Sequence, residues 1–561
     1  MKEVDASIRK YALQNAVKFG GKATEGAIQG KVLGEFPEWR KKPAELSKRI
    51  KKIVEEVNNI SLEAQKEELK NIAPELLEEK KKERKKGLPD LEDAKKVVMR
   101  FAPSPSGPLH IGHAYVLSLN SELCRKYDGT LYIRIEDTNP ENINPESYKM
   151  IEEDAQWLTK NNVAKVFIQS DRLETYYGYA EKLVGIGKAY ICTCSQDEFR
   201  ALVMKGNQCP CRDLALKEQK SRYQNLFKDY KEGEAVMRIK TSLDDPNPAM
   251  RDWPAMRINL HEHPRQKSKY RVWPLMNLAV AVDDHDFGIT HTIRAKDHMD
   301  NEKKQRYIFE YLNWKMPHHL YVGRINFRDL KISASETRRA IELGKYEGWD
   351  DIRIPFLRAL ERRGYTPDAF IKYALDVGVT QNDKYVTEEE FYKTINAFNK
   401  EVIDPISHRF FFISDPVEVA IKGAPKINVE LDLHPDSVKG GRHFKVGEKF
   451  FLSKADVDGI REGDLVRLMD LLNFTKKNGS FAYDSREYEK YKKTGKKIIH
   501  WLPANDTVKV KVRMPDGITL SGLGEPNMKG IKVNDTVQLE RFGFCRLDSK
   551  KDIYSFWFAH K

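Results

Sequence analysis

The chain has 561 residues, 40% of them hydrophobic and 32% charged, with 97 Lys and Arg against 84 Asp and Glu. This length suggests roughly three to five domains. The N-terminal segment is not apolar, which argues against a secretion signal, and no apolar run is long enough to span a membrane. A cytoplasmic location is therefore expected. The net charge of +13 favours polyanions such as nucleic acid, although a solvated basic surface would explain so modest an excess.

Residues 1–95 are predicted to form a helical N-terminal extension. Its apolar residues at helical spacing include Leu46, Ile50, Ile53, Val54 and Val57. A further helix is expected to begin at Pro74 and to end at Gly87 with a run of Lys and Glu. Such a run is typical of a solvated helix face, and a contact with RNA or a partner protein is the alternative.

Strands and helices alternate over residues 96–188. The apolar run KVVMRFA predicts a buried strand, and a proline-rich loop, a helix, a second strand, another helix and a third strand follow it. The alternation stops over residues 189–272 and returns over residues 273–330. This order predicts an α/β domain with a parallel sheet, built in two halves around an insertion.

The rest of the chain divides into a helical and a strand-rich segment. Residues 331–403 begin with a short polar loop and continue as helices, with Phe356, Leu357 and Leu360 on one face. Residues 404–561 hold many short apolar strands separated by turn residues. This pattern predicts one or two β-barrels.

Four of the six cysteines gather in the predicted insertion as two C-x-C pairs, Cys192 with Cys194 and Cys209 with Cys211. Without a secretion signal, such clustering favours a metal site over disulfides. Four thiolates suit a closed tetrahedral zinc site, so a structural Zn²⁺ that braces the insertion is predicted. The alternative is a set of reduced thiols in a loop.

The loop after the first predicted strand reads PLHIGH and leads into a helix. A helix N-terminus offers free N–H groups that suit phosphate, and His110 and His113 can donate to phosphate oxygens. Gly112 has no Cβ and would let a flat ring approach the backbone. Alone, the two histidines could equally be a metal pair or a surface pair; their place between strand and helix favours nucleotide binding.

The segments RFAPSPSGPLHIGHAYVLSLN and GTLYIRIEDTNP resemble the signature region of the glutamyl/glutaminyl branch of class I aminoacyl-tRNA synthetases. Residues 110–113 match the family's HIGH motif, VAVDDHDFGITHTIRAKDH resembles its second half-site, and LKISAS stands where the family has its KMSKS loop. GWDDIRIPFLRALERRGYTP and RFFFISDPVEV are similar to the helical and β-barrel parts of archaeal-type members. The resemblance covers about residues 97–561.

This resemblance implies a Rossmann-type catalytic domain (96–188 and 273–330) with an inserted, zinc-containing region that binds the tRNA acceptor end (189–272). It also implies a KMSKS-like loop with a helical stem-contact domain (331–403) and a β-barrel anticodon-binding domain (404–561). The implied reaction uses ATP with Mg²⁺ to form glutamyl-adenylate from L-glutamate and then charges the 3′ end of tRNA-Glu, with tRNA-Gln as a further candidate substrate. A monomer is expected.

The same motifs imply roles for individual residues of this chain. Arginine presents a planar fork to a carboxylate, so Arg100 and Arg294 are expected to bind the two carboxylates of glutamate, and Glu136 its ammonium group. The catalytic residues implied are His110, His113, Lys331 and Ser333; those for ATP are His110, Gly112, His113 and Lys331; those for glutamate are Arg100, Ala102, Ser104, Glu136 and Arg294.

Two alternatives stay open. A glutaminyl enzyme is disfavoured because PSPSGPLHIGH and IEDTNP follow the glutamyl pattern, although Met276 replaces a Tyr common in bacterial members. Ala334 replaces the second lysine of the KMSKS pattern, which motivates a catalytically inactive tRNA-binding paralogue. Asp283 and Asp284 are expected to orient neighbouring backbone; the alternative is that they order the site through water or Mg²⁺. Candidates for stacking or binding anticodon bases are Arg409, Phe410 and Trp501.

Overall fold

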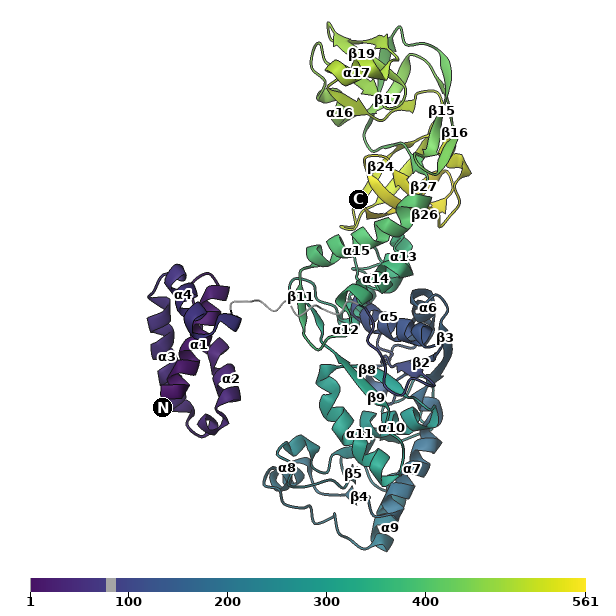
Figure 1. The fold of residues 1–561 in the computed structure, drawn as a ribbon. Coiled ribbons are helices and arrows are strands. Elements are labelled where there is room, and N and C mark those ends of the chain that lie inside the picture. The colour runs from purple at the N-terminus through teal and green to yellow at the C-terminus, as the bar shows by residue number, and fades with distance from the viewer. Residues whose placement is uncertain (1, 77–86) are drawn as a thin grey trace. The chain divides into compact units, whose positions relative to one another are not determined.

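The computed structural model describes residues 2–76 and 87–561, which Figure 1 shows as a ribbon. The chain forms two compact units, Met1–Lys85 and Lys86–Lys561. Most of the charged helix predicted between Pro74 and Gly87 lies outside the described residues; of it the structure describes a short 3-10 turn at Pro74–Leu76. In the part of the chain that is described, no helix has the length and apolar character to cross a membrane.

The first unit is a small helical bundle with a core of its own. Its α1 packs against the other three helices, and the predicted apolar stripe of α3 is buried. Ser61 caps the last helix by accepting a hydrogen bond from the backbone N–H of Ala64, which satisfies one of the free N–H groups at a helix start. The helices are α1 (Lys2–Lys18), α2 (Glu25–Glu35), α3 (Pro43–Asn58) and α4 (Leu62–Ile72).

The second unit contains the predicted parallel sheet. Strands β1, β2 and β3 pair in parallel in that order, and β8 pairs in parallel with β9. The backbone N–H of Thr290 donates to the carbonyl of Val98 at 2.9 Å, so β8 continues the layer beside β1. The α/β prediction is confirmed. The strands are β1 (Val98–Phe101), β2 (Thr130–Ile135), β3 (Val163–Ile168), β8 (His291–Ala295) and β9 (His318–Val322).

Helices link and cover these strands. The helix after β1 packs against β1, β2 and β8, and α10 packs against α11 in the second half. The helices are α5 (Ile111–Lys126), α6 (Ser147–Leu158), α7 (Leu173–Gly185), α10 (Met276–Asp286) and α11 (Met299–Tyr311).

Between β3 and β8 the chain forms a separate antiparallel sheet. Its order is β4-β5-β6-β7, and α7 and α9 pack against β4. Its apolar centre holds Tyr190 and Trp273, both fully buried. The elements are β4 (Ala189–Cys192), α8 (Gln196–Met204), α9 (Leu216–Leu226), β5 (Val236–Ile239), β6 (Pro254–Ile258) and β7 (Val272–Pro274).

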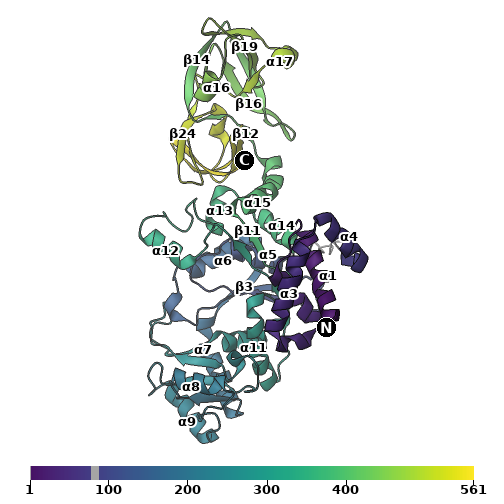
Figure 2. The same ribbon diagram turned by 90° about the vertical axis from the view of Figure 1, so that its left-hand side faces the viewer.

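Figures 1 and 2 place α13, α14 and α15 between the helices of the parallel sheet and the strands of the C-terminal part. The contacts agree, since α14 packs on α5 and α15, and α13 packs on β26 and β27. The predicted face of Phe356, Leu357 and Leu360 is fully buried. The elements are β10 (Ile325–Phe327), α12 (Ala334–Glu342), α13 (Leu357–Arg363), α14 (Pro367–Val377), β11 (Lys384–Val386), α15 (Glu388–Ile403), β26 (Gly543–Lys550) and β27 (Ile553–His560).

The C-terminal part is β-rich and contains two seven-stranded sheets and the hairpin β15–β16 (Ile427–His434, Val438–Val446). The first has the order β12 (Arg409–Phe410), β25 (Thr536–Leu539), β26, β27, β23 (Val508–Arg513), β24 (Thr519–Gly524) and β13 (Phe412–Ile413). The second has the order β21 (Lys497–Ile499), β18 (Leu465–Leu468), β19 (Leu472–Lys477), β20 (Ser480–Ser485), β14 (Pro416–Lys422), β17 (Lys449–Ser453) and β22 (Leu502–Pro503).

Each sheet curls back on itself, because its two edge strands are consecutive in the chain. Phe411 alone separates β12 from β13, and residues 500–501 separate β21 from β22. Closure of this kind hides strand edges. It also turns side chains inward, so the expectation that Phe410 and Trp501 contact anticodon bases is wrong. They are 1% and 0% exposed, and Arg409 is paired with Asp404.

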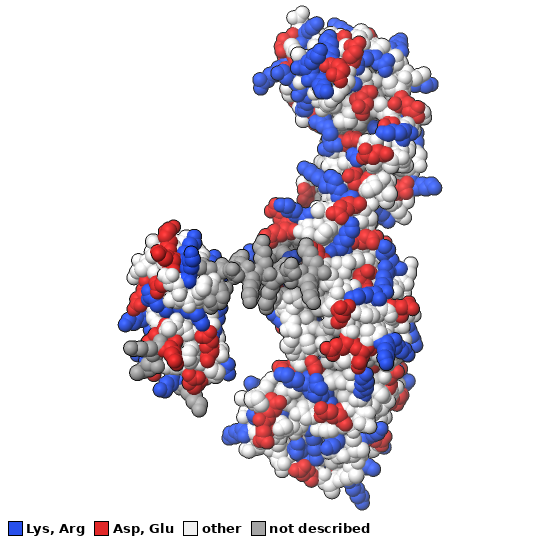
Figure 3. All heavy atoms as spheres, in the orientation of Figure 1, with Lys and Arg blue, Asp and Glu red and all other residues white. Residues whose placement is uncertain are grey.

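On the face shown in Figure 3, Lys and Arg side chains are interspersed with Asp and Glu. The positive excess of the sequence is therefore not gathered into one patch on that face. On this face, surface charge alone does not locate a nucleic-acid contact.

We expect the two units to fold independently, because each has its own core. A fragment of residues 1–85 should give a helical circular dichroism spectrum and a cooperative thermal transition of low stability, as is usual for a domain of this size. A fragment of residues 86–561 should keep the main transition of the whole chain in calorimetry. A fragment of residues 1–60 is the control, because it lacks Leu69 of the core and should not fold. Loss of the main transition in fragment 86–561 would contradict the prediction.

Candidate active site

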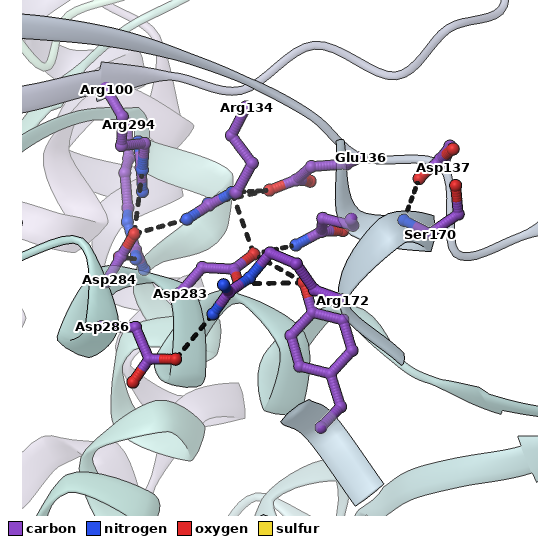
Figure 4. Close-up of polar contacts among 12 residues, drawn as sticks. Arg100, Arg134, Glu136, Asp137, Ser170, Arg172, Asp283, Asp284, Asp286 and Arg294 are labelled. Atoms are coloured by element: carbon purple, nitrogen blue, oxygen red, sulfur yellow. Dashed lines mark hydrogen bonds and ion pairs between the residues drawn. The ribbon is translucent and has the colours of Figure 1, made fainter. Parts of the chain in front are cut away.

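Three arginines from neighbouring parallel strands converge on one carboxylate (Figure 4). Arg100 is on β1, Arg134 on β2 and Arg294 on β8, and all three are at least nine-tenths buried. Asp284, near the end of α10, accepts from Arg134 at 2.5 Å and from Arg100 Nε at 3.3 Å with one oxygen, and from Arg294 at 3.4 Å with the other. The fold thus gathers three guanidinium groups around a single carboxylate.

This charge arrangement governs the ionisation of the cluster. Burial alone would raise the pKa of the Asp284 carboxyl, but the charges of the three arginines outweigh it and hold the pKa below its usual range. Burial lowers the pKa of Arg100 to about 10, which still leaves the group charged at neutral pH. The carboxylate is therefore ionised under all ordinary conditions.

The three arginines differ in how fully they are paired. Arg134 also donates to Glu136 Oε1 from Nε and from its terminal nitrogen, at 3.2 and 2.9 Å. Arg100 and Arg294 have only their single long contacts to Asp284, and Nε of Arg294 is buried without a hydrogen-bond partner among the residues described. Arg100 and Arg294 thus keep donors available for another carboxylate.

These side chains form one wall of a cavity of about 260 Å³. The histidine of α5 and a turn of α11 contribute to the lining. Six of the residues predicted from the sequence meet here: Arg100, Ala102, Gly112, His113, Glu136 and Arg294. Met276 also lines the cavity, and residues of the lining that the sequence analysis did not assign include Arg134, His298, Asn301 and Gln305.

The two histidines of the HIGH segment act as a capping pair for α5. His110 is the N-cap and accepts from the backbone N–H of Gly112 at 3.1 Å, and the two imidazole rings stack with centroids 3.7 Å apart. Burial lowers the pKa of His113 to about 4 and that of His110 well below its ordinary value, so both are neutral at pH 7. Neutral imidazoles can donate one hydrogen bond each without adding a fixed charge.

Gly112 lies close to the ring of His110. A Cβ at this position would lie 3.0 Å from Cε1 of His110, closer than ordinary van der Waals contact. The imidazole of His110 is thus one flat ring that approaches this backbone.

Four predicted site residues lie outside the lining of the cavity. Ser104 is exposed, and His110 reaches the site through its stacking on His113. Lys331 is paired with Glu336 at 2.6 Å, and Ser333 caps α12 by accepting from the backbone N–H of Glu336. The 331–335 loop does approach the loop after β1 at Ala334, because a Cβ built on Gly107 would lie 2.9 Å from Ala334 Cβ and 3.0 Å from Trp349.

The expectation that Asp283 and Asp284 orient backbone is wrong. Both accept from side chains. Asp284 accepts from the three arginines. Asp283 accepts from Arg172 with one oxygen, from Gln169 with the other and from Tyr176 with both. The sequence feature that could have indicated buried partners is the pair of acidic residues at the end of the apolar helix MNLAVAVDD. Two acids fully buried at that point require charged or hydrogen-bonding partners.

The four clustered cysteines come together as predicted. Sγ of Cys209 lies 3.4 Å from Sγ of both Cys192 and Cys194, and Cys194 lies 3.9 Å from Cys211. All four sulfur atoms are within 4.8 Å of one another, and among the described residues this is the one group with such metal-like spacing. A tetrahedral zinc with Zn–S bonds of about 2.3 Å separates its sulfurs by about 3.8 Å. The observed spacing fits that ion.

Comparisons with known proteins agree with this geometry. The profile of "tRNA synthetases class I (E and Q), catalytic domain" matches residues 96–405. Two profiles of "tRNA synthetases class I (E and Q), anti-codon binding domain" match residues 407–489 and 498–548.

Full-length relatives are similar throughout. The chain is 43% identical over 567 residues to the glutamate–tRNA ligase of Methanothermobacter thermautotrophicus and 42% identical over 565 residues to that of Methanocaldococcus jannaschii, with 100% of both chains covered in each case. A crystal structure of a glutamate–tRNA ligase from Elizabethkingia meningosepticum matches with 20% identity and a TM-score of 0.41, over 55% of this chain and 70% of that one. The resemblance seen in the sequence is thereby confirmed, and the chain belongs to the class I aminoacyl-tRNA synthetases of the glutamate and glutamine branch.

Proposed function

We propose that this protein ligates L-glutamate to the 3′ end of tRNA-Glu at the expense of ATP, with release of AMP and diphosphate. The observation that supports this most directly is the arginine-lined cavity beside His113. Three arginines line it, Glu136 is the one carboxylate of its described lining, and Asp284 lies behind it. The surplus positive charge matches the net negative charge of glutamate.

The role of each residue in glutamate binding follows from which hydrogen-bond donors are left without a partner among the described residues. Arg100 and Arg294 bind the two carboxylates, because each keeps N–H donors beyond its contact with Asp284, and Glu136, beside Arg134, accepts the ammonium group. Arg134 is a positioning residue, since its donors are taken by Asp284 and Glu136. Ala102 and Ser104 belong to the loop that closes this side of the site.

ATP is assigned to the start of α5. The positive end of the helix dipole, with Gly112 at the turn, favours the phosphates, and the neutral rings of His110 and His113 donate to the α-phosphate as charge develops there. Lys331 and Ser333 approach from the 331–335 loop. Mg²⁺ accompanies the ATP phosphates and supplies charge neutralisation.

The reaction itself needs little covalent help from the protein. A carboxylate oxygen of glutamate attacks the α-phosphorus, the bond to the β-phosphate breaks, and diphosphate leaves. A terminal ribose hydroxyl of tRNA then attacks the acyl carbon and AMP leaves. Holding the carboxylate by an arginine beside the α5 N-terminus provides the alignment on which such positional catalysis depends.

The remaining segments are assigned to tRNA and to structure. Residues 189–272 contact the acceptor end, residues 331–403 the stem, and residues 404–561 the anticodon, while residues 1–95 form an accessory helical unit. The four cysteines hold a structural Zn²⁺ that fixes the start of α8 to the loop at Cys209. In favour of this, three of the four thiols are buried and their spacing fits the ion.

Glutaminyl ligation is the competing assignment. A neutral amide would leave the surplus arginine charge of the cavity uncompensated, and uncompensated buried charge is costly. For this reason the γ-carboxylate of glutamate is the better partner. The catalytically inactive alternative rests on Ala334 alone.

Amino-acid-dependent exchange between ATP and labelled pyrophosphate tests the function. We expect exchange with glutamate when tRNA-Glu is present, and at least about a hundredfold less with glutamine, because a site that pairs a charge rejects the neutral analogue strongly. Exchange with glutamine at a similar rate would support the glutaminyl assignment. No exchange with either amino acid, with and without tRNA, would support an inactive binding protein.

Asp284→Asn is expected to disrupt the arginine cluster. The amide keeps the size of the carboxylate but leaves three buried guanidinium groups without their shared counter-ion, so the free energy of unfolding should fall by about 3–5 kcal/mol. The KM for glutamate should rise by more than the KM for ATP. Asp286→Asn, at the end of the same helix and paired only near the surface, is the control and should cost less than about 1 kcal/mol. Equal effects of the two variants would contradict the role of Asp284.

Metal analysis tests the cysteine site. We expect about one zinc per chain in freshly purified protein, and loss of that zinc in Cys209→Ser, because a structural site needs all four ligands. Cys545→Ala is the control, since Cys545 is buried in the C-terminal strands away from the cluster and should leave the zinc content unchanged. Wild-type protein without zinc would refute the assignment.

A further inference from the structure

Three side-chain amides between α10 and α11 form a chain of hydrogen bonds that ends at a histidine. Gln305 Nε2 donates to Asn277 Oδ1 at 3.0 Å, and Asn277 Nδ2 donates to Asn301 Oδ1 at 3.2 Å. Asn301 Nδ2 in turn lies 3.0 Å from Nδ1 of His298. Each amide gives a hydrogen bond to the next group, so the chain runs in one direction from Gln305 to His298.

The direction of this chain sets the position of the proton on His298. Because Nδ1 accepts from Asn301, a neutral ring carries its proton on Nε2. Partial burial and then the charge of Arg294 lower the pKa of His298, which keeps the ring neutral at pH 7. Its Nε2 makes no hydrogen bond among the described residues. The chain therefore presents one unused N–H donor of fixed position.

His298 lies among the residues assigned to glutamate. It is the N-cap residue of α11, but its side chain does not cap the helix. The side chain instead lines the cavity of about 260 Å³ together with Arg100, Glu136 and Arg294, and the residue is exposed. A cavity of this size brings a bound amino acid close to every side chain of its lining.

The amide chain does more than join two helices. The two hydrogen bonds of Asn277 already connect α10 with α11. The further bond from Asn301 to His298 stays within the first turn of α11 and adds nothing to that connection. Its effect is to fix the ring of His298 and the nitrogen that carries the proton.

We infer that His298 is a substrate-binding residue that donates from Nε2–H to a carboxylate oxygen of bound glutamate. Asn301, Asn277 and Gln305 are positioning residues, which act through the orientation and the tautomer of its ring. An ionised carboxylate has about four acceptor positions, of which a bidentate arginine takes two, so a further donor beside the arginines has a partner. This inference rests on the proposed function, because it takes the cavity as the glutamate site.

His298→Phe and His298→Gln form a matched pair. Phenylalanine keeps a flat ring without an N–H group, whereas glutamine places an amide N–H close to the position of Nε2. In tRNA-dependent exchange we expect His298→Phe to raise the KM for glutamate about tenfold or more, as for one lost hydrogen bond to a charged group, and to leave the KM for ATP nearly unchanged. His298→Gln should recover most of this loss. The control is His285→Phe, because His285 stacks on Trp314 outside the lining of the cavity.

Asn301→Leu tests the positioning chain. Leucine is similar in size but gives no hydrogen bond to Nδ1 of His298, so the ring becomes free to exchange its tautomers. In ¹⁵N NMR spectra of histidine-labelled free protein, the wild type should show the proton of His298 on Nε2, and Asn301→Leu should show a mixture of both tautomers. The signal is assigned by its loss in His298→Gln. Asn301→Leu should raise the KM for glutamate in the wild-type background and have little effect in the His298→Gln background, where no tautomer is left to fix.

Three results would overturn the inference: a wild-type ring with its proton on Nδ1, a His298→Phe variant whose KM for glutamate is unchanged or rises no more than its KM for ATP, or an Asn301→Leu effect that is equal in both backgrounds. Calorimetric titration with glutamate separates the inference from the proposed function, since binding needs no turnover. Glutamate binding that weakens in His298→Phe, in a protein without exchange activity, would support the site and refute the ligation. Exchange activity with an unchanged KM in His298→Phe would refute the role of His298 and leave the proposed function in place.

Discussion

The buried pairing of Asp284 with three arginines is the interaction on which the rest of the catalytic half depends. A carboxylate or a guanidinium group removed from water is stable only with a partner of opposite charge and good geometry. Arg100, Arg134 and Arg294 lie on three adjacent strands, so their shared carboxylate ties together β1, β2, β8 and α10. Because one carboxylate does not satisfy three guanidinium groups, the same arrangement leaves donors directed at the cavity. Stability of the sheet and affinity for an acidic ligand therefore arise from one cluster.

That constraint explains why the insertion is tolerated where it occurs. The two halves of the sheet must be adjacent for Arg100 and Arg294 to meet, but the chain between β3 and β8 is free to form its own core. It does so with an antiparallel sheet around Trp273 and Tyr190. α10 and α11 belong to both regions. Leu278 and Ile308 join the core of the antiparallel sheet, whereas Met276 and Gln305 line the proposed glutamate site.

The sequence predicts most of the architecture and part of the candidate site. The predictions that are wrong or missing share one cause. Arg100, Glu136 and Arg294 were found because they are charges inside recognisable motifs. Arg134 was passed over as one residue of a strand, and Asp284 was assigned to backbone, because their partnership joins positions 150 residues apart. The sequence predicts base contacts for Phe410 and Trp501, yet the closure of each β sheet turns these side chains inward. Closure depends on pairing at both edges of a sheet. A local sequence pattern indicates which residues form a helix or a strand. Which distant side chains pair with one another is set by the topology of the fold.

The loop at Ala334 follows from the same kind of packing. Ala334 Cβ is in contact range of Gly107, in the loop after β1, and Trp349 covers both. Two small residues let the two loops approach closely, and a lysine stem at position 334 would have to displace Trp349 or leave this contact. Lys331 is then the basic side chain of the KISAS segment that can serve the triphosphate on the proposed assignment. Its ion pair with Glu336 is largely exposed, and an exposed pair contributes at most about 1 kcal/mol, so exchanging it for an ATP phosphate costs little. On the proposed assignment, the departure from the family pattern is therefore compatible with catalysis: close packing positions the loop, and the exposed side chain of Lys331 supplies the charge.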